Sequence, residues 1–181
     1  MISICMNQYG TRAFQTLLDY ITSDEDFDIV IGHLTNNVLT LTLDHNGNHV
    51  IQKLLFKLPK NKNQFIFEEI MKNIIEVAKI QKGGIVITKA LSIANENQKV
   101  KLVSEIVKHV DKLITDTFGN FTIQTVLSSK LEDFNKTIYN YVMKNIILLS
   151  KDKFSSHVID KVIFIYLYSV FFKKITPFVT I

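Results

Sequence analysis

Apolar residues recur every three or four positions along most of this chain, rather than alternating with polar residues. One clear apolar face of this kind consists of Val50, Ile51, Leu54 and Leu55. On a helix, Asn48 and Gln52 fall on a different face of the same segment, one turn apart. Only two Pro and six Gly interrupt the chain. Helical spacing with so few breakers predicts an all-α protein.

A short pattern of these positions occurs five times. Its copies are YGTRAFQTLL from Tyr9, NGNHVIQKLL from Asn46, GGIVITKAL from Gly83, FGNFTIQTVL from Phe118 and FSSHVIDKVI from Phe154. The polar markers Gln15, Gln52, Thr88, Gln124 and Asp160 follow one another at steps of 37, 36, 36 and 36 residues. A second pattern, IMKNII, IVKHVD and VMKNII, brings Lys72, Lys108 and Lys144 into a 36-residue phase of their own. Two registers with one period predict a stack of repeated units.

Each unit contains at least two helical segments. In the second unit, Asp44 and Gly47 predict a helix start, and Pro59 closes the segment. The stretch from Gln64 to Lys79 is amphipathic again, so we expect it to pack behind the first segment and against the next unit. One unit cannot bury this much apolar surface alone, whereas stacked units can. The sequence therefore predicts an α-solenoid that curves around a hollow face.

Each copy also carries three positions away from its apolar face, which we call a triplet. The triplets are Thr11, Arg12 and Gln15; Asn48, His49 and Gln52; Gly84, Ile85 and Thr88; Asn120, Phe121 and Gln124; Ser156, His157 and Asp160. The middle residue is Arg, His or aromatic in four of the five units. Amides and carboxylates can bind the edges of bases, and planar side chains can stack on bases. Ordinary solvated positions would explain any single triplet, but the recurrence at one register favours a reader of single-stranded RNA.

Composition narrows the alternatives. A chain of 181 residues that is 47% hydrophobic can bury a sizeable core, and its net charge of +4 permits a polyanionic partner without requiring one. The single cysteine, Cys5, and the absence of a signal-like start fit a cytoplasmic protein, with the nucleus or nucleolus as alternatives. The five His show no metal-ligand spacing. No phosphate-binding Gly-rich loop occurs, because Gly83 and Gly84 are an isolated pair that predicts a helix start. We therefore expect no enzyme activity, metal or cofactor.

The C-terminal segment matches no repeat. The 11 residues from Val162 to Phe172 are almost all apolar, too few for a membrane-spanning helix of about 20 residues. We expect them to form a helix of the fifth unit that packs inward. Contact with a membrane or with another copy of the chain remains an alternative.

The segments GTRAFQ, GNHVIQK, FGNFTIQ and KFSSHVIDK resemble the core of Pumilio-type PUF repeats, over the range from Asn7 to about Ile163. DHNGNHVIQK from Asp44 carries the resemblance most specifically, and the order of units resembles repeats three to seven of an eight-repeat array. The resemblance implies a right-handed, armadillo/HEAT-like superhelix that is truncated here to about five repeats. The units lie near 1–35, 36–71, 72–107, 108–143 and 144–163, and residues 164–181 form the apolar tail.

The resemblance also implies how RNA is bound. Each unit takes one base, the first and third triplet residues contact its edge, and the middle residue stacks on it. Asn48 with Gln52, and Asn120 with Gln124, imply uracil. Ser156 with Asp160 occupies the guanine-reading positions, although aspartate is one methylene shorter than the glutamate that the family uses there.

Thr11 with Gln15 resembles the adenine-reading pairing. Gly84, Ile85 and Thr88 depart most from the family pattern, so the third unit should be weakly selective or silent. Because RNA runs antiparallel to the protein in this family, the implied core is 5′-GUNUA-3′.

The resemblance implies a regulator that binds 3′ untranslated regions of mRNA and controls mRNA stability or translation, together with protein co-regulators. No membrane partner is expected. A ribosome-assembly type of repeat protein that ignores base identity, and a protein-binding scaffold, remain alternatives. Lys53, Lys89 and Lys161 follow a third triplet residue and either meet phosphates or are simply solvated.

Overall fold

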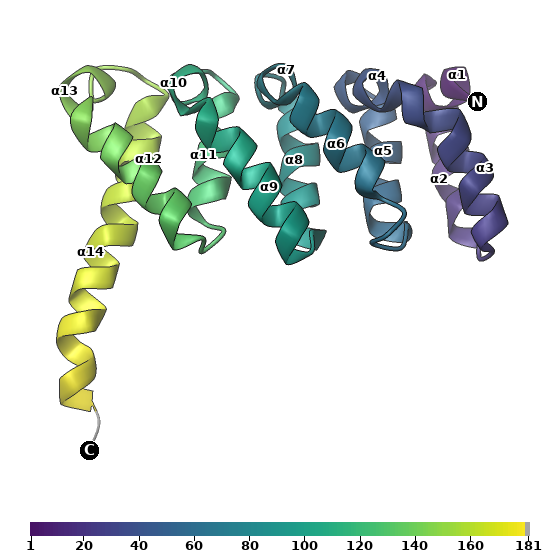
Figure 1. Ribbon diagram of the computed structural model, residues 1–181. Coiled ribbons are helices and arrows are strands. Elements are labelled where there is room, and N and C mark those ends of the chain that lie inside the picture. Colours follow the sequence, from purple (N-terminus) through teal and green to yellow (C-terminus); the bar gives the residue numbers. More distant parts are fainter. Residues whose placement is uncertain (180–181) are drawn as a thin grey trace.

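Helices are the only regular elements in the computed structural model, which describes residues 1–179 and the side chains of residues 1–167. This confirms the all-α prediction. Successive units lie side by side from the N-terminus to the C-terminus, as Figure 1 shows. The chain is therefore a solenoid, in which each unit packs on its sequence neighbours.

The helices form three sets that repeat along the stack. The triplet row carries the five triplets and consists of α2 (Gly10–Tyr20), α5 (Gly47–Lys57), α8 (Gln81–Ile93), α11 (Gly119–Leu127) and α14 (Ser155–Val179). The outer row consists of α3 (Asp24–Leu34), α6 (Gln64–Lys72), α9 (Glu96–Lys108) and α12 (Glu132–Lys144). The short linking helices are α4 (Val38–Leu43), α7 (Ile74–Ala78), α10 (Val110–Leu113) and α13 (Ile146–Leu149). The linking helices line one edge of the stack, together with α1 (Ile2–Met6), and a 3₁₀ helix, η1 (Thr35–Asn37), precedes α4 (Figure 1).

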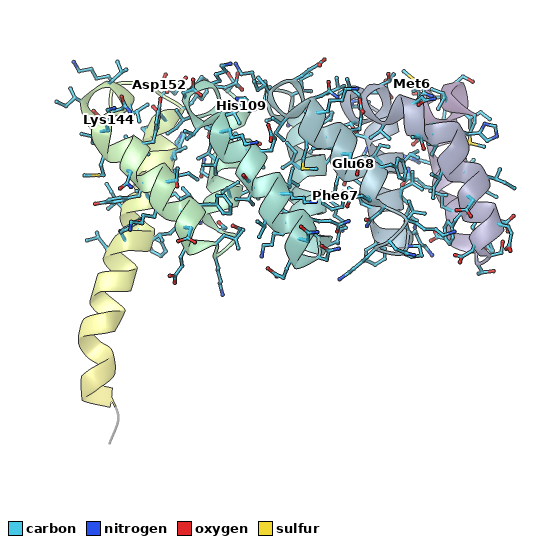
Figure 2. All side chains as sticks on the ribbon, in the orientation of Figure 1. Met6, Phe67, Glu68, His109, Lys144 and Asp152 are labelled. Atoms are coloured by element: carbon cyan, nitrogen blue, oxygen red, sulfur yellow. The ribbon has the colours of Figure 1, made fainter. Side chains whose placement is uncertain are left out.

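The core lies between the two rows and runs through all five units. The predicted apolar face of α5 is fully buried, because Val50, Ile51, Leu54 and Leu55 are each at most 1% exposed. Behind it, Ile66, Phe67 and Ile70 of α6 are equally buried. Figure 2 shows Phe67 on the outer row beside the solvent-facing Glu68. The continuous core confirms that stacked units bury what one unit alone would expose.

The amphipathic stretch predicted from Gln64 to Lys79 forms two helices, α6 and α7. α6 ends and α7 begins at Asn73, whose Nδ2 donates to the carbonyl oxygen of Glu69 at 3.0 Å and to Glu69 Oε1 at 2.9 Å. Asn145 makes the corresponding break before α13, and its Nδ2 donates to the carbonyl oxygen of Tyr141 at 2.8 Å. His109 occupies this place before α10, at the edge of the stack in Figure 2. Asn competes for nearby backbone groups, so it ends a helix even where the apolar pattern continues.

The start of most triplet-row helices is set by an Asx turn. Asp44 Oδ1 accepts hydrogen bonds from the backbone N–H groups of Asn46 at 2.9 Å and Gly47 at 2.7 Å, as the sequence predicted for α5. Asn7, Asp116 and Asp152 make the same pair of bonds before α2, α11 and α14. At Asp152, the Ser155 N–H holds the carboxyl pKa below its usual value. In these four units the helix therefore begins three residues after the Asx residue.

The third unit starts differently. Ile80 stands in the place of the Asx residue, and α8 begins at Gln81, ahead of the predicted start at Gly83 and Gly84. Gly83 lies so close to the preceding linking helix that an added Cβ would overlap the carbonyl oxygen of Val77. Gly84 faces open space, where an added Cβ would find only Thr122 Oγ1, at 3.9 Å. The first glycine therefore serves packing, and the second leaves a gap.

The apolar tail continues α14 as a helix to Val179, and Figure 1 shows that helix running beyond the other helices of the stack. Only one side of its first half packs inward: Tyr166 stacks on Tyr139 of α12 with ring centroids 3.9 Å apart, whereas Phe164 and Leu167 are each 64% exposed. The backbone beyond that point does not follow the stack, which differs from the prediction for the whole tail. The side chains from 168 onward lie outside the described residues. Within the described part, no helix is both long and apolar enough to cross a membrane.

Candidate nucleic-acid interface

The middle triplet residues line up on one surface of the triplet row. Arg12, His49, Ile85, Phe121 and His157 are all exposed, with Ile85 at 45% and Phe121 at 59%. Each stands on its own helix at the same register, so the five form a ladder with one rung per unit. We call this face the triplet surface. Exposed aromatic and apolar side chains at such regular spacing form a surface on which flat groups can stack.

In the second unit, hydrogen bonds fix the side-chain amides of Asn48 and Gln52. Asn48 is only 1% exposed, and its Nδ2 donates to the carbonyl oxygens of Asp44 at 2.9 Å and His45 at 2.7 Å. Its Oδ1 accepts a hydrogen bond from Gln52 Nε2 at 2.8 Å. Asn48 is therefore committed at both ends of its amide. The half-buried Gln52 keeps its Oε1 and one N–H for another partner.

The fourth unit repeats this arrangement. Asn120 is 0% exposed, and its Nδ2 donates to the carbonyl oxygens of Asp116 at 2.9 Å and Thr117 at 3.0 Å. Gln124 Nε2 donates to Asn120 Oδ1 at 2.9 Å. Two units 72 residues apart thus hold a glutamine in the same orientation by the same bonds.

In the first unit, threonine replaces asparagine. Thr11 is 4% exposed and its Oγ1 donates to the carbonyl oxygen of Asn46 in the next unit at 3.1 Å. Gln15 Nε2 donates to Thr11 Oγ1 at 3.3 Å and to the Thr11 carbonyl oxygen at 3.2 Å. Thr11, Asn48 and Asn120 thus lie beneath the surface that the third residues face. Whether they touch a base directly stays a prediction.

The fifth and third units present different chemistry. Ser156 is half-buried, and its Oγ donates to the carbonyl oxygen of Lys153 at 2.9 Å, while Asp160 is exposed. In the third unit, Gly84 has no side chain, and the exposed Thr88 donates its hydroxyl to the Gly84 carbonyl oxygen at 3.0 Å. The fifth unit thus offers an acceptor-only carboxylate, and the third unit offers little to a ligand from its own triplet.

Hollows open between neighbouring rungs of the ladder. One of about 590 Å³ is lined by Arg12 and His49, and one of about 480 Å³ by Phe121 and His157. The central one, of about 450 Å³, lies between Ile85 and Phe121. Each hollow is walled by the middle residues of two consecutive units. A planar group between two rungs would therefore contact both.

Other residues that the sequence did not single out line these hollows. Tyr9 borders the first, and Gln81, Phe118 and Thr122 border the central one. Phe118 and Tyr9 occupy the position just before the helix start, so the repeat alignment itself would have pointed to them.

The lysines after the third triplet residues are partly engaged within the protein. Lys53 Nζ lies 2.7 Å from Asp19 Oδ1, and Lys89 Nζ lies 5.3 Å from the ring centroid of Phe56. Lys161 borders the hollow beside His157. Among the described side chains, no group of three or more His, Cys, Asp or Glu is arranged to hold a metal ion.

A family model described as the Pumilio-family RNA binding repeat matches residues 1–35, 37–71, 85–107 and 145–163, more than half of the chain. A Pumilio domain-containing protein of Schizosaccharomyces pombe is 41% identical over 73 residues, which is 40% of this chain and 11% of that protein. The suppressor protein MPT5 of Saccharomyces cerevisiae is 37% identical over 78 residues, which is 40% of this chain and 9% of that protein. The matched segments are thus a small part of these relatives.

Solved structures agree over most of the chain. The Puf4 RNA binding domain bound to an HO endonuclease RNA 3′ UTR recognition sequence superposes with a TM-score of 0.85 at 35% identity, covering 90% of this chain and 51% of that one. The RNA-binding domain of yeast Puf5p bound to SMX2 RNA gives 0.80 at 35% identity, covering 89% and 47%. The chain therefore spans about half the length of these domains.

Proposed function

The chain belongs to the Pumilio family of RNA-binding repeat proteins, and we propose that it binds single-stranded RNA with one base per unit and a core of 5′-GUNUA-3′. The RNA is an mRNA recognised through its 3′ untranslated region, and the outcome is regulation of mRNA stability or translation in the cytoplasm. The observation that carries the proposal is the pair of oriented glutamines, Gln52 and Gln124, beneath a ladder of planar side chains.

The two glutamines favour uracil. Each has one N–H committed to an asparagine, so it offers one N–H donor and one carbonyl acceptor to a ligand. The pairing edge of uracil presents an N–H beside a carbonyl oxygen, which is the complementary pattern. Because the asparagine fixes the glutamine before RNA arrives, little side-chain entropy is lost on binding.

The terminal units favour purines. Asp160 accepts hydrogen bonds only, and guanine presents two adjacent N–H donors on one edge. At the other end, Gln15 Nε2 donates to two oxygens of Thr11, which leaves Oε1 to accept a hydrogen bond from the amino group of adenine. With the antiparallel direction that family membership implies, G lies at Asp160 and A lies at Gln15.

Stacking supplies the affinity that edge contacts do not. Planar side chains contribute about 1 to 3 kcal/mol for each stacked base, and Arg12, His49, Phe121 and His157 stand exposed for this purpose. Ile85 interrupts the ladder with an aliphatic side chain, so the central base gains less from stacking.

Fluorescence anisotropy with labelled RNA tests the proposal at fixed salt. We expect RNA containing GUAUA to bind at least about five-fold more tightly than the CUAUA variant, because a lost edge contact costs about 1 to 3 kcal/mol. Equal, weak binding to both would contradict it and favour a protein-binding scaffold. Strong but equal binding would instead favour a repeat protein that ignores base identity. Sequencing of RNA fragments cross-linked to the chain in cells tests the assignment to mRNA.

A further inference from the structure

The first unit exposes apolar positions that are buried in every later unit. Leu17 of α2 is 52% exposed. The residues at its register in the other units are at most 1% exposed: Leu54, Ala90, Val126 and Val162. Ile4 of α1 is 50% exposed, whereas the residues at its register in the linking helices are at most 2% exposed: Leu41, Val77, Leu113 and Leu149. Since the later units differ from the first in having a unit before them, that preceding unit supplies the cover.

Tyr20 extends this exposed surface along α2. It is 79% exposed, whereas the residues at its register in the later units are half-buried: Lys57, Ile93, Ser129 and Ile165. We call Ile4, Leu17 and Tyr20 the N-terminal face. The terminal units of a solenoid need polar caps to stay soluble, and this face presents an isoleucine, a leucine and a tyrosine instead.

The fifth unit exposes the opposite side of the same interface. Ile163 of α14 is 46% exposed, whereas the residues at its register are at most 8% exposed: Leu18, Leu55, Leu91 and Leu127. Ser156 lies on this side of α14 too, and its counterpart Thr11 donates to the carbonyl oxygen of Asn46 in the next unit at 3.1 Å. This side therefore faces a following unit, and none follows the fifth in the described part of the chain. The C-terminal face, as we call it, consists of Ser156, Asp160, Ile163 and Leu167.

Contacts between neighbouring units show which residues would meet if the stack continued. Asp19 Oδ1 lies 3.0 Å from Lys57 Nζ in the next unit. Phe164, which is 64% exposed, stands at the register of Asp19 in the fifth unit, and Tyr20 stands at the register of Lys57 in the first. A second copy placed as the following unit would therefore form an aromatic pair where an ion pair joins the first two units.

Charge is complementary across the same junction. Each hollow between units is lined by the third triplet residue of one unit and the middle triplet residue of the next: Gln15 with His49, Gln52 with Ile85, and Gln124 with His157. At a junction between two copies, Asp160 would share such a hollow with Arg12 of the second copy. A carboxylate and a guanidinium attract each other and can form a bidentate hydrogen-bonded pair.

We propose that two copies of this chain stack end to end, with the C-terminal face of one copy on the N-terminal face of the other. The contact repeats the interface between units, so the triplet row continues through the junction. One copy spans 51% of the Puf4 domain on which it superposes, so a stacked pair is about as long as that domain. Because the two faces differ, the contact is heterologous and leaves one free face at each end for further copies.

Sedimentation velocity tests the proposal without RNA, so its result is independent of the proposed function. We expect the mass of the unmodified chain to rise with concentration from 20.8 kDa to at least about twice that value. A single species of 20.8 kDa at every concentration up to about 1 mM, the range of weak association, would overturn the inference. The two faces would then belong to contacts with a different protein.

Two variants that each disable one face sharpen the test. Leu17→Asp blocks the N-terminal face and Ile163→Asp blocks the C-terminal face, because docking would bury the new charge. Each variant alone should stay at 20.8 kDa. An equimolar mixture should form a pair of about twice that mass and grow no further, because each variant retains the face that the other lacks.

Leu148→Asp is the matched control. Leu148 of α13 is 72% exposed and lies outside both faces, because the residues at its register in other units are exposed as well: Thr40, Glu76 and Lys112. This variant should associate like the unmodified chain. Circular dichroism melts compare the three variants, and Leu17→Gln or Ile163→Gln replaces an aspartate variant that melts earlier than the control, since glutamine favours a helix. Self-association of either single-face variant, or a mixture that stays monomeric, would contradict end-to-end stacking.

Discussion

At the scale of single residues, the first and third residues of a triplet have different roles. The first residue orients the third by a hydrogen bond, and the third is left to contact a ligand. The side-chain amides of Asn48 and Asn120 hydrogen-bond within their own unit through both the NH₂ group and the oxygen. The bond to the oxygen comes from the glutamine one turn later and fixes its orientation. The sequence shows two amides at adjacent turns and gives no sign of this difference. Burial decides it, because the two asparagines are at most 1% exposed and bond to the turn before their own helix, whereas Gln52 and Gln124 line the hollows.

A double substitution in the fourth unit tests whether the triplets act as a modular code. Asn120→Ser with Gln124→Glu gives this unit an acceptor-only group, as Asp160 gives the fifth unit. We expect the preference at the second base of GUAUA to shift from U toward G, by about 1 to 3 kcal/mol of discrimination. Anisotropy with GUAUA and GGAUA measures the shift.

The same exchange in the second unit, Asn48→Ser with Gln52→Glu, is the matched control, and it should change the preference at the fourth base only. Circular dichroism melts would show that both double variants remain folded. An unchanged preference at the second base would count against a modular code in this chain.

At the scale of elements, the sequence predicts where helices lie better than where they break. The apolar pattern runs on from Ile70 to Ile74, so it gave one segment where the structure has α6 and α7. Asn73 separates them through bonds to Glu69 that compete with the helix. Likewise, the glycines at 83 and 84 predicted a helix start, although α8 begins at Gln81, where Ile80 replaces the Asx residue that forms a turn before the other triplet-row helices.

Alanine at the two adjacent glycines of α8 should change the free energy of unfolding in opposite directions. Gly83→Ala should lower the free energy of unfolding by about 1 to 3 kcal/mol, because the new methyl group meets the carbonyl oxygen of Val77. Gly84→Ala should raise it by up to about 1 kcal/mol, because the methyl has room and alanine favours a helix. Urea unfolding followed by circular dichroism measures both, and similar effects of the two variants would refute the assignment of Gly83 to packing.

At the scale of the whole molecule, the repeat period predicts the solenoid architecture, but it does not predict where the C-terminal tail packs. Five units in one register require neighbours that cover one another, and the core confirms this from Leu18 to Val162. The tail is apolar on every side, so its sequence does not say which face is covered. In the structure, Tyr166 packs against Tyr139, whereas Phe164 and Leu167 are each 64% exposed.

Electrostatics across units provides a prediction for the binding surface as a whole. Asp19 of α2 bridges to the next unit, with its Oδ1 2.7 Å from Lys53 Nζ and 3.0 Å from Lys57 Nζ. Hydrogen bonds from these two lysines hold the Asp19 pKa below its usual value, so the carboxylate is charged at neutral pH. This pairing offsets the positive charge of Lys53, which directly follows Gln52 in the sequence.

Asp19→Asn should therefore strengthen binding to GUAUA and CUAUA by a similar factor, because phosphate contacts carry no sequence information. The dependence of affinity on salt should steepen, by about 0.7 in the logarithmic slope for each additional phosphate that the protein neutralises. Asp28→Asn removes the same charge from outer-row helix α3, where Asp28 Oδ1 lies 2.7 Å from Lys62 Nζ, and it should leave RNA binding nearly unchanged. Anisotropy titrations across a series of salt concentrations measure both variants. If Asp19→Asn binds like the unmodified chain at every salt concentration, Lys53 does not meet the RNA backbone.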